Sequence, residues 1–190
     1  IADDFRPGAT GERGTPITLA DLARGDVNID TCNVCHGKLA IHGGGARVEV
    51  RYCVVCHTEQ FAYGQPKVTS TAGKFPALTP SVTTDAVTGI KTYRYSPATN
   101  IADGEVTGNF NTMIHKIHQG KELVKENYHY AGVVFNNKGF SKLGGGQRMC
   151  TTCHDSKVAS TAENYKLLPS RTACGACHDG IVWSTGGGST

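Results

Sequence analysis

The chain has 190 residues, a formal net charge of +3 and a hydrophobic fraction of 38%. Its length fits one domain, but Leu, Ile, Val and Phe make up only about a fifth of it, which barely buries enough apolar surface to offset the ordering entropy. Lys and Arg form no run and no apolar stretch reaches the length of a membrane span, so nucleic-acid binding and a transmembrane helix are both excluded.

The first chemical signal follows residues 1–16, which are expected to be extended. Because the chain begins at Ile1 and no signal peptide precedes it, we expect a processed or trimmed product. Motif 1, Cys32-Asn-Val-Cys35-His36, places a His directly after two cysteines. His42 comes shortly afterwards, before a run of glycines that either lets the backbone lie flat against a planar group or forms a flexible turn.

The next elements are a predicted strand, motif 2 and an insertion. Residues 47–52, Arg-Val-Glu-Val-Arg-Tyr, alternate in the manner of a β-strand, and motif 2, Cys53-Val-Val-Cys56-His57, follows at once. Residues 58–106 contain no Cys or His. Within them, residues 81–95 are predicted to form a β-hairpin that turns near residues 85–89. The insertion is either a decoration or a surface that docks a neighbouring molecule.

A short amphipathic helix is predicted at residues 110–120, and it carries His115 and His118. Residues three apart leave the same face of a helix, so these two imidazoles cannot bind one metal ion from opposite sides. They would therefore serve two neighbouring centres. The apolar residues at helical spacing are Phe110, Met113, Ile114 and Ile117, with Thr107 or Asn109 as the N-cap and Gly120 as the stop.

The C-terminal third contains a second predicted hairpin and two more motifs. Residues 127–131 alternate as a strand does and contain His129, and residues 128–143 are predicted to turn near residues 136–139. Motif 3, Cys150-Thr-Thr-Cys153-His154, and motif 4, Cys174-Gly-Ala-Cys177-His178, follow. Residues 183–190 are expected to be extended, which suits either a tail or a contact between chains.

All eight cysteines therefore lie in C-x-x-C pairs that a His follows directly, which is the pattern of c-type haem attachment. Two thiols add to the two vinyl groups of one porphyrin, and the adjacent imidazole then reaches the iron from the same side. The sequence predicts four covalent haems c held by Cys32, Cys35, Cys53, Cys56, Cys150, Cys153, Cys174 and Cys177, with His36, His57, His154 and His178 as proximal iron ligands.

Three other interpretations use the same cysteines. A disulfide framework suits a secreted protein, and spacing alone permits a zinc site at the four cysteines of motifs 1 and 2. Neither gives the repeated His a role. A thioredoxin-like redox pair requires a βαβ setting, for which the sequence gives no sign.

The second axial ligands are predicted from a count. Four histidines lie outside the motifs, so one spare imidazole per haem would make every iron six-coordinate with two His ligands. Met113 is expected to pack on the helix face and Met149 adjoins motif 3, so we expect no Met ligation, and two imidazoles per iron imply low-potential haems. The predicted distal ligands are His42, His115, His118 and His129.

The predicted fold class is a multihaem cytochrome with little regular secondary structure. Short helices and small β-hairpins would wrap a chain of four covalent haems, and the porphyrins would supply most of the hydrophobic core. Residues 1–190 are predicted to be a single tetrahaem cytochrome c domain, with the insertion at about 58–106.

Several segments resemble the OmcA/MtrC type of outer-surface multihaem cytochromes of metal-reducing bacteria. The resemblance covers residues 30–180 apart from the insertion. It implies that His42, His115 and His118 are distal ligands and that the protein lies at the outer membrane face or outside the cell, after export through the periplasm. The matching segments are residues 32–44, 50–57, 113–120 and 174–179.

The chain departs from that family in size. Its members carry more haems, in two domains separated by β-barrel domains, whereas this chain has four motifs. It is therefore either a fragment of such a protein or a free-standing subunit similar to the polymerising extracellular cytochrome filaments. A head-to-tail homopolymer needs an interface that repeats without closing, and His129 or another spare His would then bind a haem of the next subunit.

The expected function is electron transfer by haem-to-haem hopping, in extracellular electron transfer and without enzymatic activity. Expected partners are other cytochromes or copies of the chain itself, and acceptors such as metal oxides and electrodes, but no nucleic acid. The alternative is a multihaem reductase of the nitrite or hydroxylamine type. Such an enzyme needs an open iron position, and four spare histidines for four haems argue that none is open.

Overall fold

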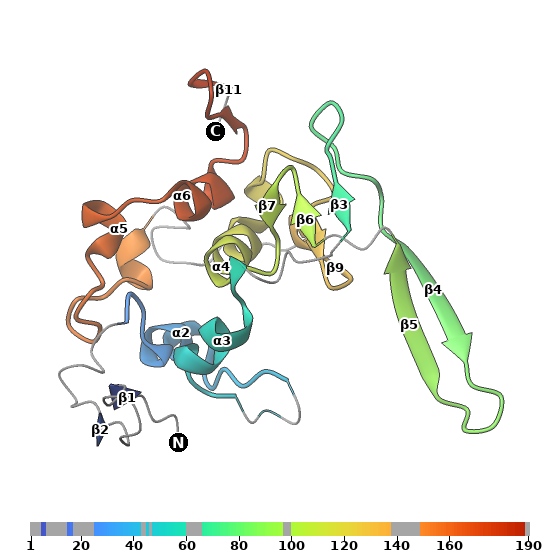
Figure 1. The fold of residues 1–190 in the computed structure, drawn as a ribbon, viewed down its shortest axis with the longest axis horizontal. Coiled ribbons are helices and arrows are strands. Elements are labelled where there is room, and N and C mark those ends of the chain that lie inside the picture. Colours follow the sequence, from blue (N-terminus) through green and yellow to red (C-terminus); the bar gives the residue numbers. More distant parts are fainter. Residues whose placement is uncertain are drawn as a thin grey trace. The chain divides into compact units, whose positions relative to one another are not determined.

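A computed structural model describes residues 25–42, 45, 47–59, 66–96, 100–137 and 149–188, together with the short strands at 5–6 and 15–16 (Figure 1). Its helices are short, and α4 is the longest at 10 residues. The helices are α2 (Ile29–His36), α3 (Val50–Cys56), α4 (Phe110–Gln119), α5 (Asn164–Leu167) and α6 (Arg171–Cys177), with 3₁₀ turns η2 (Gly120–Glu122), η3 (Phe135–Asn137) and η5 (Cys150–Thr152).

The strands form only small sheets. Four antiparallel pairs join β1 to β2, β4 to β5, β8 to β9 and β10 to β11, and one three-stranded sheet has the order β3-β6-β7, with β3 parallel to β6. Short helices and small hairpins confirm the predicted fold class in this coarse form. The bounds are β1 (Phe5–Arg6), β2 (Thr15–Pro16), β3 (Lys67–Val68), β4 (Thr79–Thr84), β5 (Lys91–Ser96), β6 (Ile101–Ala102), β7 (Glu105–Val106), β8 (His129–Tyr130), β9 (Val133–Val134), β10 (Ile181–Val182) and β11 (Gly187–Gly188).

The chain groups into two compact units. Unit 1 contains residues 1–56 and 148–169, and unit 2 contains residues 57–147 and 170–190. Within the described ranges, no helix combines the length and the apolar character needed to cross a bilayer.

Hydrogen bonds join distant segments in the described part of unit 1. The Asn28 side chain caps α2 by accepting from the Asp30 N–H, and its amide donates to the Val158 carbonyl at 3.3 Å. Among the described residues of unit 1, the buried apolar side chains are only Ala159 and Ala162. These two alanines by themselves remove little apolar surface from water.

Unit 2 has an aromatic core. It consists of buried side chains from the β3 and β6 strands, the segment after β3 and the segment after α4, and the α4 residues Met113 and Ile117 pack against it. These two are four residues apart and so lie on one face of the helix, as predicted. The core residues are Val68, Phe75, Ala102, Leu123, Tyr128 and Phe135.

Helix α4 confirms the prediction for residues 110–120. Asn109 is the N-cap, and its side-chain oxygen accepts from the N–H groups of Asn111 and Thr112. Gly120 ends the helix with a φ of 53°, a conformation that favours glycine. Met113 packs in the helix face as expected.

The predicted strand at residues 47–52 is wrong, because residues 50–56 form α3. Val50, Cys53 and Val54 have the spacing of one helix face as well as part of a strand alternation, so the local pattern is ambiguous. The Tyr52 N–H donates to the Glu49 carbonyl, and this bond begins the helical turn that carries the cysteines of motif 2.

The hairpin predicted at residues 81–95 is confirmed by the β4–β5 pair. The carboxylate of Asp85 accepts from the N–H groups of Val87 and Thr88 at 3.0 and 2.7 Å, which shapes the loop between the strands. Gly89 has a φ of +69°, as the turn requires.

The second predicted hairpin exists, but its turn was misplaced. Strands β8 and β9 turn at Ala131 and Gly132, which both have positive φ, instead of near residues 136–139. Asn136 serves a different purpose: its side chain accepts from the Tyr128 N–H and donates to the Lys125 carbonyl. Residues 138–143 lie outside the described residues.

The C-terminal residues also differ from the expected extended tail. Strands β10 and β11 pair antiparallel, so the chain turns back after Trp183. Of residues 1–16, the structure describes only the strands β1 and β2, which pair with each other.

Candidate haem-binding sites

The attachment motifs lie on single helical turns. The cysteines of motifs 1, 2 and 4 are in α2, α3 and α6, and motif 3 starts in η5. Residues at i and i+3 of a helical turn share a face, so each turn presents both thiols on one side. The N–H groups of His154 and His178 donate to the carbonyls of Cys150 and Cys174 at 2.9 Å, which closes the turn and places the His directly after it.

The cysteines form no disulfides, and exposed apolar side chains lie between those of motifs 1 and 2. None of the eight cysteines is in a disulfide, and each is exposed or half-buried. The residues between the cysteines of motifs 1 and 2 expose apolar surface, with Val34 at 82% and Val55 at 75%. Exposed apolar side chains beside paired thiols suit contact with a planar apolar group such as a porphyrin.

The donor geometry does not resemble a zinc site. Burial raises the pKa values of the Cys32, Cys53 and Cys153 thiols. Within the described part of the chain, which includes all eight Cys and all eight His, no three Cys, His or acidic side chains are placed to hold one metal ion.

Three histidines have their Nδ1 atom fixed by a backbone carbonyl. The Nδ1 atoms of His57, His115 and His118 lie 2.8, 2.7 and 2.8 Å from the carbonyl oxygens of Gly108, Asn111 and Ile114. A carbonyl oxygen only accepts, so each Nδ1 carries the hydrogen and donates it. The lone pair is then on Nε2, which is the tautomer that binds a metal through Nε2. These side chains therefore fit haem iron chemically.

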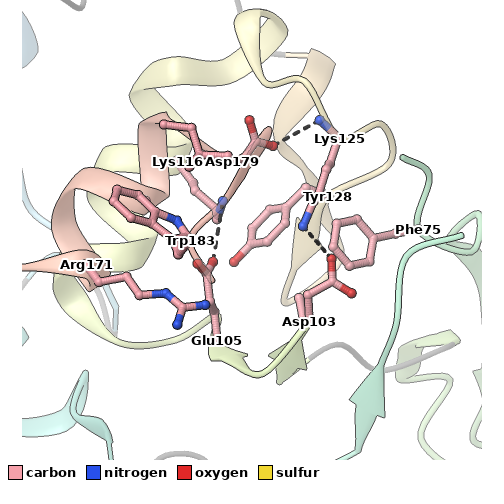
Figure 2. Close-up of a pocket in the computed structure, with 12 residues that line it drawn as sticks. Phe75, Asp103, Glu105, Lys116, Lys125, Tyr128, Arg171, Asp179 and Trp183 are labelled. Carbon is pink, nitrogen blue, oxygen red and sulfur yellow. Dashed lines mark hydrogen bonds and ion pairs between the residues drawn. The ribbon is translucent and has the colours of Figure 1, made fainter. Parts of the chain in front are cut away.

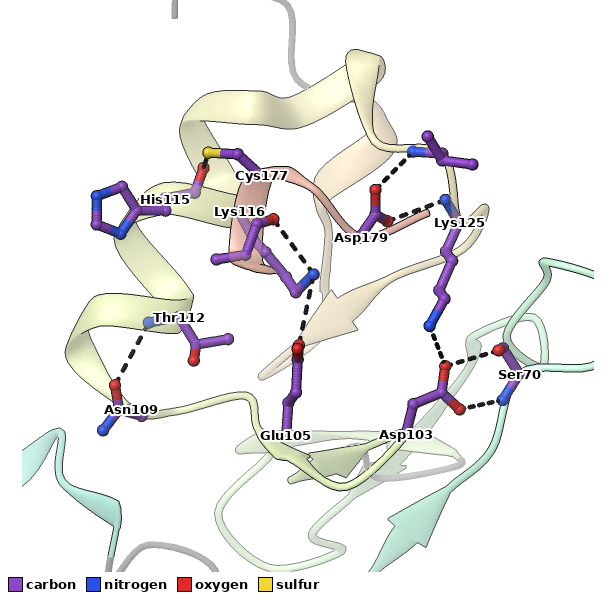
Figure 3. Close-up of polar contacts among 12 residues, drawn as sticks. Ser70, Asp103, Glu105, Asn109, Thr112, His115, Lys116, Lys125, Cys177 and Asp179 are labelled. Atoms are coloured by element: carbon purple, nitrogen blue, oxygen red, sulfur yellow. Dashed lines mark hydrogen bonds and ion pairs between the residues drawn. The ribbon is translucent and has the colours of Figure 1, made fainter. Parts of the chain in front are cut away.

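Helix α4 packs against α6, and this contact brings the backbone of His115 to motif 4 (Figure 3). The Cys177 thiol lies 3.9 Å from the His115 carbonyl oxygen, and the Lys116 ammonium donates to the Ala176 carbonyl at 3.3 Å. Each of these bonds joins the helix of two predicted distal ligands to the turn that carries a predicted haem.

His57 lies at the other end of the same helix. Its carbonyl accepts from the Phe110 N–H at 2.9 Å, and its ring meets the Tyr130 ring edge-on, with centroids 6.4 Å apart. Unit 2 thus contains His57, His115, His118 and motif 4.

The remaining spare histidines have contrasting surroundings. His129, on β8, is 1% exposed, and burial lowers the pKa of its imidazole although a hydrogen bond to the Pro76 backbone raises it in part. It is therefore neutral at pH 7. His42 is exposed and has a φ of 61°, in a turn where its carbonyl accepts from the Gly45 N–H.

The structure also reveals polar residues that the sequence analysis missed (Figure 2). Asp179, directly after motif 4, accepts from the N–H groups of Val124 and Lys125 at 2.9 and 3.0 Å and so fixes the end of the motif. Lys116, between the two α4 histidines, is 1% exposed and lies 3.6 Å from the Glu105 carboxylate. The available signal was a charged residue inside an amphipathic helix between two candidate ligands.

One comparison with known proteins finds a match. A family model described as outer membrane cytochrome MtrC/MtrF-like, domains II/IV, matches residues 24–188. The matched range includes all four motifs and all four spare histidines. No curated protein and no solved structure matches the chain.

Proposed function

Because the chain belongs to the outer membrane MtrC/MtrF-like cytochrome family, we propose that it is a tetrahaem c-type cytochrome that moves electrons by hopping between its haems. Membership of this family supports extracellular multihaem electron transfer in general, and a location at the outer membrane surface or outside the cell. The observation that carries the tetrahaem proposal is the set of four C-x-x-C-H motifs, each with its paired thiols on one helical turn.

The iron ligands are proposed to be two imidazoles per haem. His36, His57, His154 and His178 would be proximal, and His42, His115, His118 and His129 distal. The Nδ1 bonds of His57, His115 and His118 and the neutral state of His129 support this ligation, because all four side chains then offer a lone pair to iron. Such haems have low potentials and no open position for a substrate.

The two α4 histidines also bear on the path of the electrons. Their Nδ1 atoms both bond to the carbonyl four residues earlier, so the rings leave α4 in the same manner, one turn apart. They would serve two different haems. A helix turn is short, so those two haems would lie close together, which favours fast transfer between them.

We propose that the 190 residues form a single tetrahaem domain with the insertion at about 58–106. Its partners would be other cytochromes or copies of itself, with metal oxides or electrodes as acceptors. In a filament, a distal His would bind a haem of the next subunit. The burial of His129 favours a haem of its own chain, whereas the exposed His42 reaches solvent and is the better candidate for binding between subunits.

Intact mass and spectroscopy test this proposal. The mass of the purified protein is expected to exceed that of the polypeptide by four haems, and the electron paramagnetic resonance spectrum of the oxidised protein should contain low-spin signals only. Fewer than four haems would contradict the tetrahaem proposal. A high-spin signal, or binding of nitrite or hydroxylamine, would instead support a multihaem reductase.

Electron microscopy of the same material tests assembly. Filaments with a regular subunit repeat are expected for the polymer, and His42→Ala should shorten or abolish them while His129→Ala should reduce the low-spin signal of isolated subunits. A monodisperse monomer with four low-spin haems would contradict the polymer.

A further inference from the structure

A buried lysine lies beside the attachment turn of motif 4. Lys116, on α4, is 1% exposed, and its ammonium is 4.7 Å from the centre of the Tyr128 ring (Figure 2). It donates to the carbonyl of Ala176, which stands between the two cysteines of motif 4. The positive charge is therefore held against the turn that would carry the haem.

Packing alone does not account for this charge. Moving an ammonium from water into a protein interior is costly, and the bonds of Lys116 to the Ala176 carbonyl and to Glu105 offset that cost. Met113 and Ile117 on the same helix already face the core. A charge at Lys116 is therefore explained better by an electrostatic role than by packing.

In the part of the chain that the structure describes, Glu105 is the carboxylate that pairs with Lys116. Glu105 is 3.6 Å away, and the Glu105 side chain is more exposed than the lysine. The two neighbouring carboxylates have other partners: Asp179 accepts from two backbone N–H groups, and Asp103 pairs with Lys125 at 2.6 Å (Figure 3). Changing Lys116 or Glu105 would therefore change the net charge beside motif 4 in opposite directions.

We propose that the ion pair between the buried Lys116 and the half-buried Glu105 sets the reduction potential of the haem on motif 4, with Lys116 raising it and Glu105 lowering it. This inference rests on the proposed function, because it requires a haem at Cys174 and Cys177. Reduction of ferric to ferrous iron adds one electron and no other group. A nearby cation stabilises the reduced state and an anion destabilises it, and both effects are stronger where water is excluded.

Redox titrations of the holoprotein test the proposal. Lys116→Met is expected to lower the midpoint potential of one of the four haems, and Glu105→Gln to raise the potential of the same haem. Each change should alter the equilibrium constant for reduction by about tenfold, which is about 59 mV for one electron. Lys116→Arg keeps the charge, and a cavity of about 50 Å³ beside Lys116 provides some room for the larger group, so its potential should stay near that of the wild type.

Lys121→Met is the matched control. Lys121 also lies 3.6 Å from a carboxylate, that of Glu122, but its side chain is 55% exposed. Water and salt screen an exposed pair, so no haem potential should move. The comparison separates the effect of a buried charge from the loss of any lysine.

The opposite signs distinguish electrostatics from damage to the fold. Loosened packing would expose the haem in both variants and shift both potentials in the same direction. Shifts of the same sign in the two variants, or no shift in Glu105→Gln, would overturn the proposal. If Lys116→Met does not fold, the potential measured in Glu105→Gln still tests the proposal. Haem content is measured in every variant: loss of the motif 4 haem from the wild type itself would be a failure of the proposed function, not of this inference.

Discussion

Asp103 shows how one side chain can join three segments of unit 2. It has a φ of 50° in the turn between β6 and β7, where Gly104 follows. Its carboxylate accepts from the N–H and the hydroxyl of Ser70 at 2.7 and 2.6 Å and pairs with the Lys125 ammonium at 2.6 Å. Burial alone would raise the pKa of Asp103, but the bonds from Lys125 and Ser70 outweigh it and lower the pKa below its ordinary value of 3.8.

Asp103→Asn should therefore destabilise unit 2 in a pH-dependent way. The loss is expected to be about 1 to 2 kcal/mol at pH 7, where the carboxylate is ionised. Since the folded pKa is lowered, the wild-type contribution is present above pH 3.8 and is lost as the pH falls through the folded pKa. Urea unfolding of both proteins at pH 7 and near pH 3 measures the difference, which should shrink in acid.

Asp85→Asn is the control for that series. Asp85 also has a lowered pKa, caused by hydrogen bonds from Thr88 and Val87, but it lies in the exposed β4–β5 loop, and these bonds are made within that loop. Its substitution should leave global unfolding unchanged. A loss in Asp103→Asn that is as large near pH 3 as at pH 7 would contradict the assigned role of the carboxylate charge.

The folded structure also shows why a small residue fits at Gly175. A Cβ atom there would lie 3.2 Å from Nε1 of Trp183, so the indole ring leaves little room for a side chain at this position of motif 4. In the sequence, Gly175 is one of the two residues between the cysteines of motif 4, and Trp183 begins the segment that was expected to be extended.

At the scale of elements, the β4–β5 hairpin folds without a core. Every side chain that the structure describes in β4, β5 and their loop is exposed, and Val87 at the loop is 93% exposed. The hairpin was predictable because strand alternation and an Asp-containing turn act locally. For the same reason it contributes little to the rest of the protein.

Replacing residues 79–96 by a short Gly-Ser turn should change the free energy of unfolding by only about 0.5 kcal/mol or less. Phe135→Ala, in the core, is the contrasting variant and should cost about 3 to 5 kcal/mol. Thermal unfolding of both holoproteins checks the difference. A comparable loss in the hairpin variant would show that the hairpin packs against another surface.

The prediction of α4 was confirmed, whereas the strand predicted where α3 begins was wrong, and both results depend on how many local signals agree. Helix α4 has four apolar residues at helical spacing, a side-chain N-cap and a terminal glycine, so several local signals agree. The run before motif 2 is short, and its alternating valines satisfy a strand pattern as well as part of a helical one. Residues 50–56 form a helix, and the cysteines of motif 2 that complete it lie beyond residues 47–52.

For the whole molecule, the two units have unequal cores. Unit 2 buries three large aromatic side chains, Phe75, Tyr128 and Phe135, whereas the buried apolar side chains described in unit 1 are two alanines. Unit 1 nevertheless contains the cysteines of motifs 1, 2 and 3. This inequality agrees with the expectation that porphyrins supply the missing apolar contacts.

Replacing all eight cysteines by Ala should therefore unfold most of the protein. Circular dichroism is expected to show a large loss of helix, because no porphyrin would be retained to cover the exposed apolar side chains. Hydrogen exchange should show the loss first in α2 and α3 of unit 1, and later in α4, which has its own side-chain core. Near-native circular dichroism of this haem-free variant would contradict the scaffold role of haem.

The sequence by itself determined the attachment motifs, the predicted cofactor, helix α4 and the β4–β5 hairpin, because each depends on residues that are neighbours in the chain. Only the tertiary structure decided the burial of His129, the turn at residues 131 and 132, and the contacts of Lys116 and Asp179. Lys116 is 60 positions from its carbonyl acceptor, and Asp179 is 55 and 54 from its two donors. The periodicity of residue types along a helix or strand does not indicate such partners, because burial and charge pairing arise only when distant segments pack together.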